Sequence, residues 1–368
     1  MGERKKVIID LLREEDNGAI LDLSHRCIQH GVMSVYPDRT PVFNRIHKEI
    51  DPGAFHLVAR KGDKLIGCFG GIYTPVQHEG KVYNSLYMLD FKVDPDHQKS
   101  MTAYRLVKEI YERTFGQGQE MGFASIIKGN VASRIFTEGR AGFPPSNYLG
   151  EIHYNNSIPL LKKRVDKRYV IEHPVEEDIV ELVDLYTRFY ETYKLAPFIS
   201  EELFRYYLDK IEGIDLENMW VAREKGKIKA VLCAWDENIY KRMKVMTIPR
   251  GMKVALSVIR FLSGFMKMPA TMRPGDALRQ RTLVMMAHDQ NIEALKNLVR
   301  HVYNIHRGTE YSVLQTHFHE EDPMRQVLKG MFGLKVEIEI HMLTGDPALG
   351  KKIEETSGPV LFEWPMFI

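Results

Sequence analysis

One loop of the sequence combines residue types that bind anions and connects a strand to a helix. The stretch "YMLDFKVDPDHQKSMTAYRLVKEIYERTF", residues 87–115, begins with the alternation of a strand and ends as a long amphipathic helix. The first backbone N–H groups of a helix have no partner within it, and the helix dipole favours negative charge there. The polar middle, residues 94–100, is therefore typical of a phosphate site, although a turn capped by Ser100 has the same pattern.

Asp90 interrupts the apolar strand before this loop. An unpaired buried carboxylate is costly, so Asp90 either acts as a general base or forms a salt bridge with a lysine or arginine of a helix. The alternation places Tyr87 on the same face as Phe91 and Val93, with Asp90 on the other. Nothing in the pattern brings His56, or the histidine of the loop, within reach as a base.

A second polar stretch, "HFHEEDP", contains His317, His319 and Asp322. Residues two apart on a strand share a face, so the two histidines could ligate one metal ion. No third ligand stands at a clear spacing, and the sequence therefore predicts no metal site. The histidines are expected on the surface, in hydrogen bonds, or along a cleft.

The bulk composition indicates a cytoplasmic globular protein of two domains. The chain has 368 residues, 51 basic and 49 acidic, so its net charge of +2 does not favour a nucleic-acid partner. Its three cysteines lie far apart, as reduced thiols do, and the N-terminus has no apolar stretch typical of a signal peptide.

Two halves of the chain repeat the same pattern. "EEDNGAILDLSHR" from Glu14 matches "EEDIVELVDLYTR" from Glu176 at one constant offset, and a predicted hairpin from His56 matches one from Trp220. A strand, a long helix, a strand and a short helix follow in both halves. We therefore predict two tandem copies of one module: copy one, residues 1–164, and copy two, residues 165–368.

Each copy is expected to form a mixed α/β sheet, because an antiparallel hairpin precedes a strand–helix–strand crossover. This order, together with the loop after residue 93, resembles the GNAT superfamily of N-acetyltransferases. The resemblance covers nearly the whole chain as two tandem domains. It implies an acyl-CoA N-acyltransferase fold, with acetyl-CoA or another acyl-CoA as cosubstrate and no metal.

The resemblance assigns a cofactor site to copy one. The family's phosphate loop corresponds to Gln98-x-x-Met101-x-Ala103, where Met101 replaces the usual glycine. The pantetheine arm of coenzyme A would lie beside the preceding strand, where the following strand diverges. The implied cofactor-binding residues are Phe91, Lys92, Val93, Gln98, Lys99, Ser100, Met101, Thr102, Ala103, Asn130 and Ser133. Asn130 could equally be a helix cap beside a glycine.

The catalytic residues are less clearly implied. The family often places a tyrosine in the helix before the closing Gly-Phe pair, where this sequence has Phe136, Thr137 and Glu138. Proton return would then use water, Glu138 or Tyr148. Tyr87 and Asp90 are candidate bases, and the terminal carboxylate of Ile368 is another, since some related transferases use it. An apolar tail that completes a sheet is the alternative.

Copy two departs from the family pattern. Its loop is expected to be about three residues shorter than that of copy one, and Glu293 would repel a phosphate. It also carries an insertion, residues 240–281, whose centre is "GMKVALSVIRFLSGFMKM" with Lys253, Arg260 and Lys267 on one helix face. This segment could be a lid or dimer helix, could bind an apolar substrate or could lie on a membrane surface, but it is too short and charged to span one.

The sequence thus predicts an acyl-CoA-dependent N-acyltransferase that acetylates a primary amine, on a small molecule or a peptide, as a monomer or homodimer. A long-chain acyl or aminoacyl-tRNA transferase on the same fold is one alternative. A non-catalytic protein that binds or senses acyl-CoA is the other, since copy one lacks the usual glycine and tyrosine.

Overall fold

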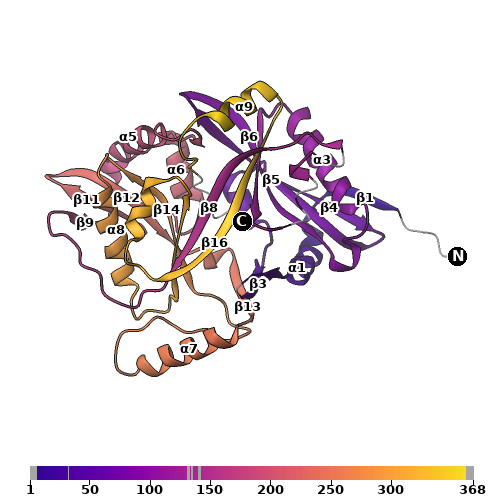
Figure 1. Ribbon diagram of the computed structural model, residues 1–368. Helices are drawn as coiled ribbons and strands as arrows, with labels where there is room; N and C mark the ends of the chain where they lie inside the picture. Colours follow the sequence, from indigo (N-terminus) through magenta and orange to yellow (C-terminus); the bar gives the residue numbers. More distant parts are fainter. Residues whose placement is uncertain (1–5, 32, 131–132, 134–135, 140–141, 362–368) are drawn as a thin grey trace.

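One long sheet with helices on both faces forms the body of the protein (Figure 1). The structure is a computed structural model and describes residues 6–31, 33–130, 133, 136–139 and 142–361. The elements of copy one are β1 (Val7–Leu11), α1 (Asn17–Arg26), β2 (Gln29–His30), β3 (Ser34–Asp38), α2 (Arg45–Ile50), β4 (Phe55–Lys61), β5 (Lys64–His78), β6 (Lys81–Val93), α3 (Thr102–Gly116), β7 (Met121–Ile127) and β8 (Asn147–Ser157).

Copy two repeats this order with an insertion. Its elements are β9 (Val170–Glu172), α5 (Ile179–Tyr190), β10 (Ala196–Pro197), α6 (Glu201–Lys210), β11 (Met219–Glu224), β12 (Lys227–Trp235), β13 (Arg242–Thr247), α7 (Arg250–Leu262), β14 (Gln280–His288), α8 (Ile292–Ile305), β15 (Val313–His319), β16 (Gly333–Thr344) and α9 (Pro347–Glu355).

The strands of the two copies join in one sheet of order β1-β4-β5-β6-β7-β16-β8-β15-β14-β12-β11-β9. Only β6–β7 and β14–β15 pair in parallel among the strands of this order. The predicted mixed α/β sheet is thereby confirmed. The last strands exchange partners: β8 of copy one pairs with β15 of copy two, and β16 of copy two pairs with β7 of copy one.

The two copies also share side-chain contacts at matching positions. Arg60 donates two hydrogen bonds to the Asp16 carboxylate, and Arg223 donates to Asp178 at 2.6 Å. In each copy the aspartate precedes the first helix and the arginine lies in the first strand of the hairpin. The repeated sequence pattern therefore corresponds to a repeated structural detail.

Successive side chains of the hairpin strands point to opposite faces of the sheet in copy one, and each face packs against a different helix. Leu57 and Ala59 of β4 pack in the cluster under α3, whereas Val58 packs in the cluster under α1. Gly67 of β5 brings α3 close to the sheet: a Cβ there would lie 3.0 Å from the Leu106 side chain. This close packing fixes where the N-terminus of α3 lies relative to β6.

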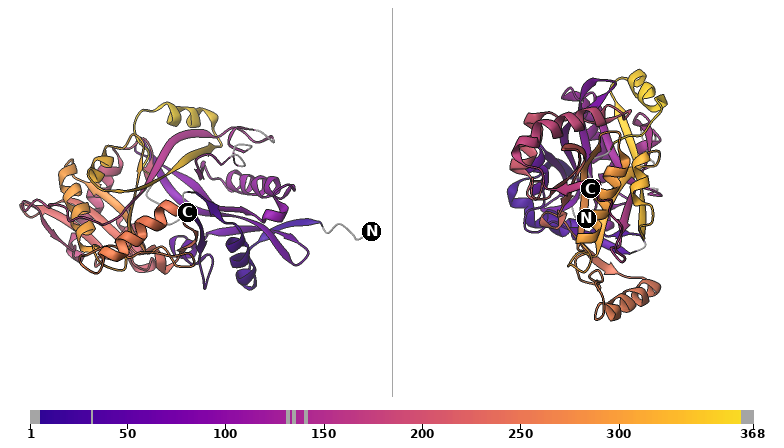
Figure 2. Two further views of the ribbon diagram at one scale, coloured as in Figure 1. Left: turned by 60° about the horizontal axis from the view of Figure 1, so that its bottom comes forward. Right: turned by 90° about the vertical axis from the view of Figure 1, so that its left-hand side faces the viewer.

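The insertion of copy two crosses to copy one. Its strand β13 pairs with β3 in a small separate sheet, and α7 projects from the body, as the right-hand view of Figure 2 shows. The helix ends at Leu262, so the prediction that Lys267 shares its basic face is wrong. None of the helices in the described ranges is long and apolar enough to cross a membrane.

Candidate functional site

The candidate site begins where β6 and β7 separate. These strands pair in parallel only from Ser85 opposite Met121 to Met88 opposite Ala124. At Asp90 the backbone takes a left-handed conformation, with φ of 56°, and the register with β5 shifts. This bulge leaves the last residues of β6 paired with β5 on one side and unpaired with β7 on the other.

The bulge also corrects the predicted alternation along β6. Tyr87 is buried in the same cluster as Ile46 of α2, and its hydroxyl donates a hydrogen bond to Ser125 Oγ at 2.7 Å. Phe91 instead packs on Phe69, in the cluster under α3, with ring centroids 4.7 Å apart. The prediction that Tyr87 and Phe91 share a face is wrong, because the extra residue of the bulge reverses the alternation.

Asp90 lies in a buried group of charged residues. Its side chain is 3% exposed and accepts hydrogen bonds from Arg39 and Lys92. Burial alone would raise the pKa of Asp90, but Arg39 and Lys92 outweigh it and hold the pKa well below its ordinary value. The predicted salt bridge therefore exists, although its cations come from the residue after β3 and from β6 itself, and not from a helix.

Two histidines complete this group. His56 Nε2 lies 3.3 Å from Asp90 Oδ2, and His47 Nε2 lies 3.9 Å from the same oxygen. Burial lowers the pKa of both rings, and the charge of Arg39 lowers them further. Both nitrogens of His47 and Nδ1 of His56 are buried without a hydrogen-bond partner in the part of the chain that the structure describes. Such atoms call for a water molecule or a polar ligand.

His56 was not predicted to reach the site, but the fold brings it to Asp90 across β5. His56 pairs with Gly70 in the β4–β5 ladder, and a Cβ on Gly70 would lie 2.6 Å from the imidazole ring. The ring therefore occupies space that only glycine leaves open. A glycine opposite a histidine in a predicted hairpin was the one sequence signal that could have identified this contact.

Two clusters of described residues have side chains that could ligate a metal, but neither suits a divalent ion. His47, His56 and Asp90 lie within range of one ion, but Arg39 and Lys92 already neutralise the carboxylate. The second cluster, Glu151, His153 and Glu337, has Lys128 Nζ at 2.7 Å and 3.2 Å from its two carboxylates. A divalent cation would have to displace these ammonium and guanidinium groups.

The residues of "HFHEEDP" are engaged elsewhere. His317 stacks on Tyr154, with ring centroids 5.7 Å apart, and His319 Nε2 lies 2.8 Å from the carbonyl oxygen of Leu149. Asp322 accepts a hydrogen bond from the Tyr193 hydroxyl at 3.0 Å, and burial raises its pKa to about 6. His317 and His319 thus contact β8 of copy one, whereas Asp322 bonds within copy two.

The loop before α3 presents backbone N–H groups at a helix N-terminus. Ser100 Oγ accepts from the Thr102 N–H at 3.3 Å, so the serine satisfies one of these donors. No acceptor lies within hydrogen-bond distance of the N–H groups of Ala103 and Tyr104 among the residues that can be described. Gln98, Lys99, Ser100 and Met101 are exposed at this terminus, and Pro95 and Asp96 are exposed earlier in the loop. The geometry is that of an anion site.

Asp94 holds this loop in place. Its buried carboxylate accepts from the Asp96 N–H at 3.0 Å and lies 3.0 Å from Lys64 Nζ and 3.1 Å from Arg26. Burial opposes its ionisation, yet these contacts lower its pKa. Because the loop is already fixed, ligand binding costs no further conformational entropy for ordering it.

Three other predicted site residues, Asn130, Ser133 and Glu138, belong to the segment between β7 and β8. Ser133 Oγ donates to the Asn130 carbonyl oxygen at 2.7 Å, and Glu138 lies exposed in a turn. Phe136, which stands where the family often has tyrosine, lies with its ring 5.9 Å from that of Phe91. Ile368 lies outside the described residues.

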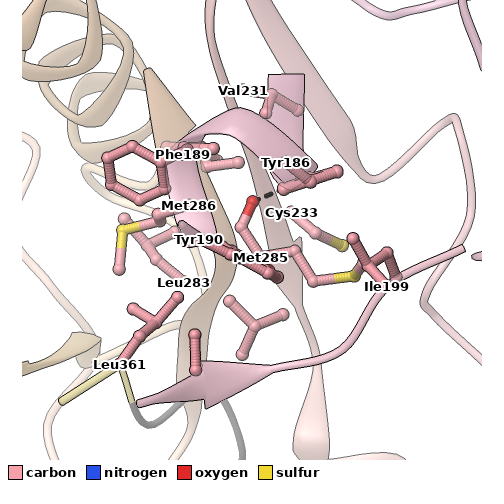
Figure 3. Close-up of a cluster of buried hydrophobic side chains, with 14 of the residues drawn as sticks. Tyr186, Phe189, Tyr190, Ile199, Val231, Cys233, Leu283, Met285, Met286 and Leu361 are labelled. Carbon is pink, nitrogen blue, oxygen red and sulfur yellow. Dashed lines mark hydrogen bonds between the residues drawn. The ribbon is translucent and has the colours of Figure 1, made fainter. Parts of the chain in front are cut away.

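Copy two has an equivalent opening, which is the region where two neighbouring parallel strands separate, but side chains fill it. β14 and β15 pair in parallel only from Gln280 to Thr282, and Met285 has φ of 52° at the equivalent bulge. Figure 3 shows the Tyr186 hydroxyl donating to the Met285 carbonyl oxygen, a hydrogen bond of 2.8 Å. The surrounding side chains include Phe189, Tyr190 and Leu361.

The equivalent segment of copy one, the end of α1 and the two residues after it, carries smaller side chains. At an offset of 162 residues, the positions of Tyr186, Phe189 and Tyr190 correspond to Ser24, Cys27 and Ile28. Three aromatic residues therefore occupy the opening in copy two, where copy one has a hydroxyl, a thiol and one aliphatic side chain.

The loop before α8 is also closed to an anion. It comprises residues 289–291, against residues 94–101 in copy one, so it is five residues shorter and not three as predicted. Asn291 Oδ1 accepts from the Ala294 N–H at 3.2 Å, and Asp289 pairs with Lys229 at 2.7 Å. The helix terminus is capped by its own side chain, and a negative charge stands next to it.

Comparison with known proteins agrees with this asymmetry. The model of the acetyltransferase (GNAT) family matches residues 19–143, which include the opening and loop of copy one but no part of copy two. No curated protein sequence matches the chain. The fold and this match together confirm the predicted resemblance to the GNAT superfamily.

Similar solved structures cover both copies. N-myristoyltransferase from Saccharomyces cerevisiae with bound myristoyl-CoA has a TM-score of 0.63 at 13% identity, over 93% of this chain and 83% of that one. A conserved protein of unknown function from Enterococcus faecalis, a probable N-acyltransferase, has a TM-score of 0.51 at 10% identity, over 91% of this chain and 72% of that one. The fold of this chain is thus that of two tandem GNAT domains.

Proposed function

We propose that the chain is an acyl-CoA-dependent N-acyltransferase whose donor binds in copy one. The observation that carries this proposal is the contrast between two equivalent openings. In copy one the strands separate beside a long loop with free N–H groups, whereas in copy two aromatic side chains fill the gap. The family match to residues 19–143 alone agrees with a single donor site.

The donor would lie along the unpaired edge of β6. The pyrophosphate of coenzyme A would accept hydrogen bonds from the N–H groups of Ala103 and Tyr104, with Lys99 exposed beside them. The thioester would then reach the bulge at Asp90, where the backbone of residues 91–93 has no partner on the β7 side. A hydrogen bond to the thioester oxygen there would stabilise the charge that develops during transfer.

The acceptor is a primary amine, and acetyl is the acyl group that we propose first. The amine nitrogen attacks the thioester carbon, the carbon–sulfur bond breaks and coenzyme A leaves as the thiolate. The nitrogen loses a proton in the process. His56 is neutral and lies beside Asp90, so it is the proposed acceptor of that proton, and Asp90 holds the ring in position. Asp90 itself is a poor base because its pKa is depressed.

A longer acyl chain is a second candidate, favoured by an aromatic cluster next to the opening. Phe91 is 36% exposed and contacts Phe69 and Phe136, and Phe143 lies 5.8 Å from Phe136. Such a wall suits an apolar chain better than an acetyl group. The fold neighbour from yeast was solved with myristoyl-CoA, which supports the same possibility.

Calorimetric titration with acetyl-CoA and myristoyl-CoA tests the proposal. We expect micromolar binding of at least one donor, and the tighter ligand decides between the two candidates. Ala103→Glu places a carboxylate near the pyrophosphate and should weaken binding by about two to three decades, from about 3–4 kcal/mol of repulsion at 4 Å. Ala103→Gln controls for size, and Lys108→Glu controls for a charge change on the exposed face of the same helix.

Turnover separates an enzyme from a binding protein. Release of free coenzyme A thiol with a panel of primary amines should be detected for the unchanged protein and lost in Ala103→Glu. His56→Gln should lower turnover while leaving donor affinity unchanged. Absence of binding by any acyl-CoA would overturn the proposal, and binding without turnover on any amine would favour an acyl-CoA sensor.

A further inference from the structure

Helix α7 exposes an apolar stripe that the proposed acyl transfer does not use. Met252 and Leu256 attach one side of the helix to a small cluster around Val245 and Leu278. No residue of α7 is buried. Large apolar side chains point to solvent along the helix and the turn after it: Val254 is 65% exposed, Val258 51%, Phe261 70%, Phe265 77% and Met266 54%. Figures 1 and 2 show α7 standing apart from the sheet.

The same segment carries only positive charge. Residues 238–275 contain no aspartate or glutamate. Five cations in this segment are exposed, and none forms a salt bridge within the described ranges: Arg250, Lys253, Arg260, Lys267 and Arg273. An exposed apolar stripe with cations beside it is complementary to a surface that has negative charge outside and an apolar interior.

Charge also argues against the alternative that the apolar stripe of α7 binds a second copy of the chain. Two α7 helices packed through this stripe would bring Lys253 and Arg260 of each near those of the other, without any acid in the segment to compensate. Like charges opposed at an interface are unfavourable. A lid over the site of copy one is equally unsupported, because α7 projects away from β6 and α3 (Figure 1).

We propose that α7 docks the protein on anionic lipid membranes. The helix lies in the plane of the interface, Phe261 and Phe265 insert among the acyl chains, and the cations contact lipid phosphates. The two rings already lie against each other, with centroids 5.5 Å apart, and form the most exposed point of the stripe. This inference does not rest on acyl transfer, since it uses no residue of the donor site.

Vesicle flotation of the full chain tests the proposal. The probes are vesicles of phosphatidylcholine alone and of equal parts phosphatidylcholine and phosphatidylglycerol, each at low and high salt. We expect the protein to float only with the anionic vesicles and to be released by salt. Lys253→Glu/Arg260→Glu should weaken binding on the order of 100-fold, and Phe261→Ser/Phe265→Ser by more than about tenfold.

Matched variants elsewhere control for net charge and surface polarity. Lys351→Glu/Lys352→Glu on α9, at the opposite end of the molecule in Figure 1, and Phe332→Ser, which is 62% exposed, should bind vesicles like the unchanged protein. All variants should keep the same unfolding midpoint, because the altered side chains are exposed. The proposal is overturned if anionic vesicles are not bound, or if the α7 variants bind as the controls do. A dimer that dissociates in the Phe261→Ser/Phe265→Ser variant, without vesicle binding, would assign the stripe to a second copy.

Discussion

Replacing Asp90 by asparagine should destabilise the protein far more than the loss of an ordinary salt bridge. The carboxylate is 3% exposed and accepts from Arg39, which is 2% exposed, and from Lys92, which is 11% exposed. Asparagine keeps the shape but removes the charge, which leaves two cations in the interior without compensation. Removing one partner of a buried ion pair costs about 3–5 kcal/mol, a large part of an unfolding free energy of about 5–15 kcal/mol.

Urea unfolding with a surface control isolates this effect. Asp166 pairs with Arg168 on the surface, with exposures of 39% and 63%, so Asp166→Asn should cost less than about 1 kcal/mol. The double variant Asp90→Asn/Arg39→Met should be less destabilised than the sum of its single changes, by about 0.5–3 kcal/mol, because one uncompensated charge is gone. If Asp90→Asn costs no more than Asp166→Asn, the argument that the group is held together by charge is refuted.

Three further changes probe the same architecture. Gly70→Ala puts a methyl group 2.6 Å from the His56 ring, so turnover should fall at least about tenfold with donor affinity unchanged; an unaltered rate would contradict the role of His56. Tyr186→Phe removes a buried donor to the Met285 carbonyl oxygen and should cost about 1–3 kcal/mol in urea unfolding, without any effect on donor binding. His47 and His56 have lowered pKa values when folded and ionise near pH 6.5 when unfolded, so the unfolded chain binds more protons below that pH. The unfolding free energy should therefore fall as pH drops from 6.5, by at most about 1.4 kcal/mol per pH unit for each ring, and His47→Gln should flatten the slope.

The sequence predicted the elements of each copy because their patterns are local. The match between Glu14 and Glu176 identified the duplication, and the loop after β6 was recognised from residues that follow one another in the chain. The exchange of β8 and β16 was not predicted. The pairing of these strands depends on contacts between residues 157 to 223 positions apart, and no local pattern records them.

Only those parts of the site that consist of residues adjacent in sequence were predicted. The bulge at Asp90 reverses the alternation that assigned Tyr87 and Phe91 to one face, and an aspartate in a left-handed conformation has no distinct sequence pattern. Arg39, which directly follows β3, and His56 of β4 precede Asp90 by 51 and 34 positions in the chain. Charge compensation across strands is therefore visible only once the fold is known.

The two copies depend on each other structurally because their strands pair in one sheet. In copy two, Tyr186 and its neighbours make the equivalent strand opening part of the packed core. Because β16 of copy two pairs with β7, copy two also supplies the strand next to β7 of copy one. Lys241 of copy two, which pairs with the buried Glu237 at 3.3 Å, also interacts electrostatically with Arg39 and Asp90. Copy two therefore contributes both a neighbouring strand and a buried cation to the surroundings of the charged site in copy one.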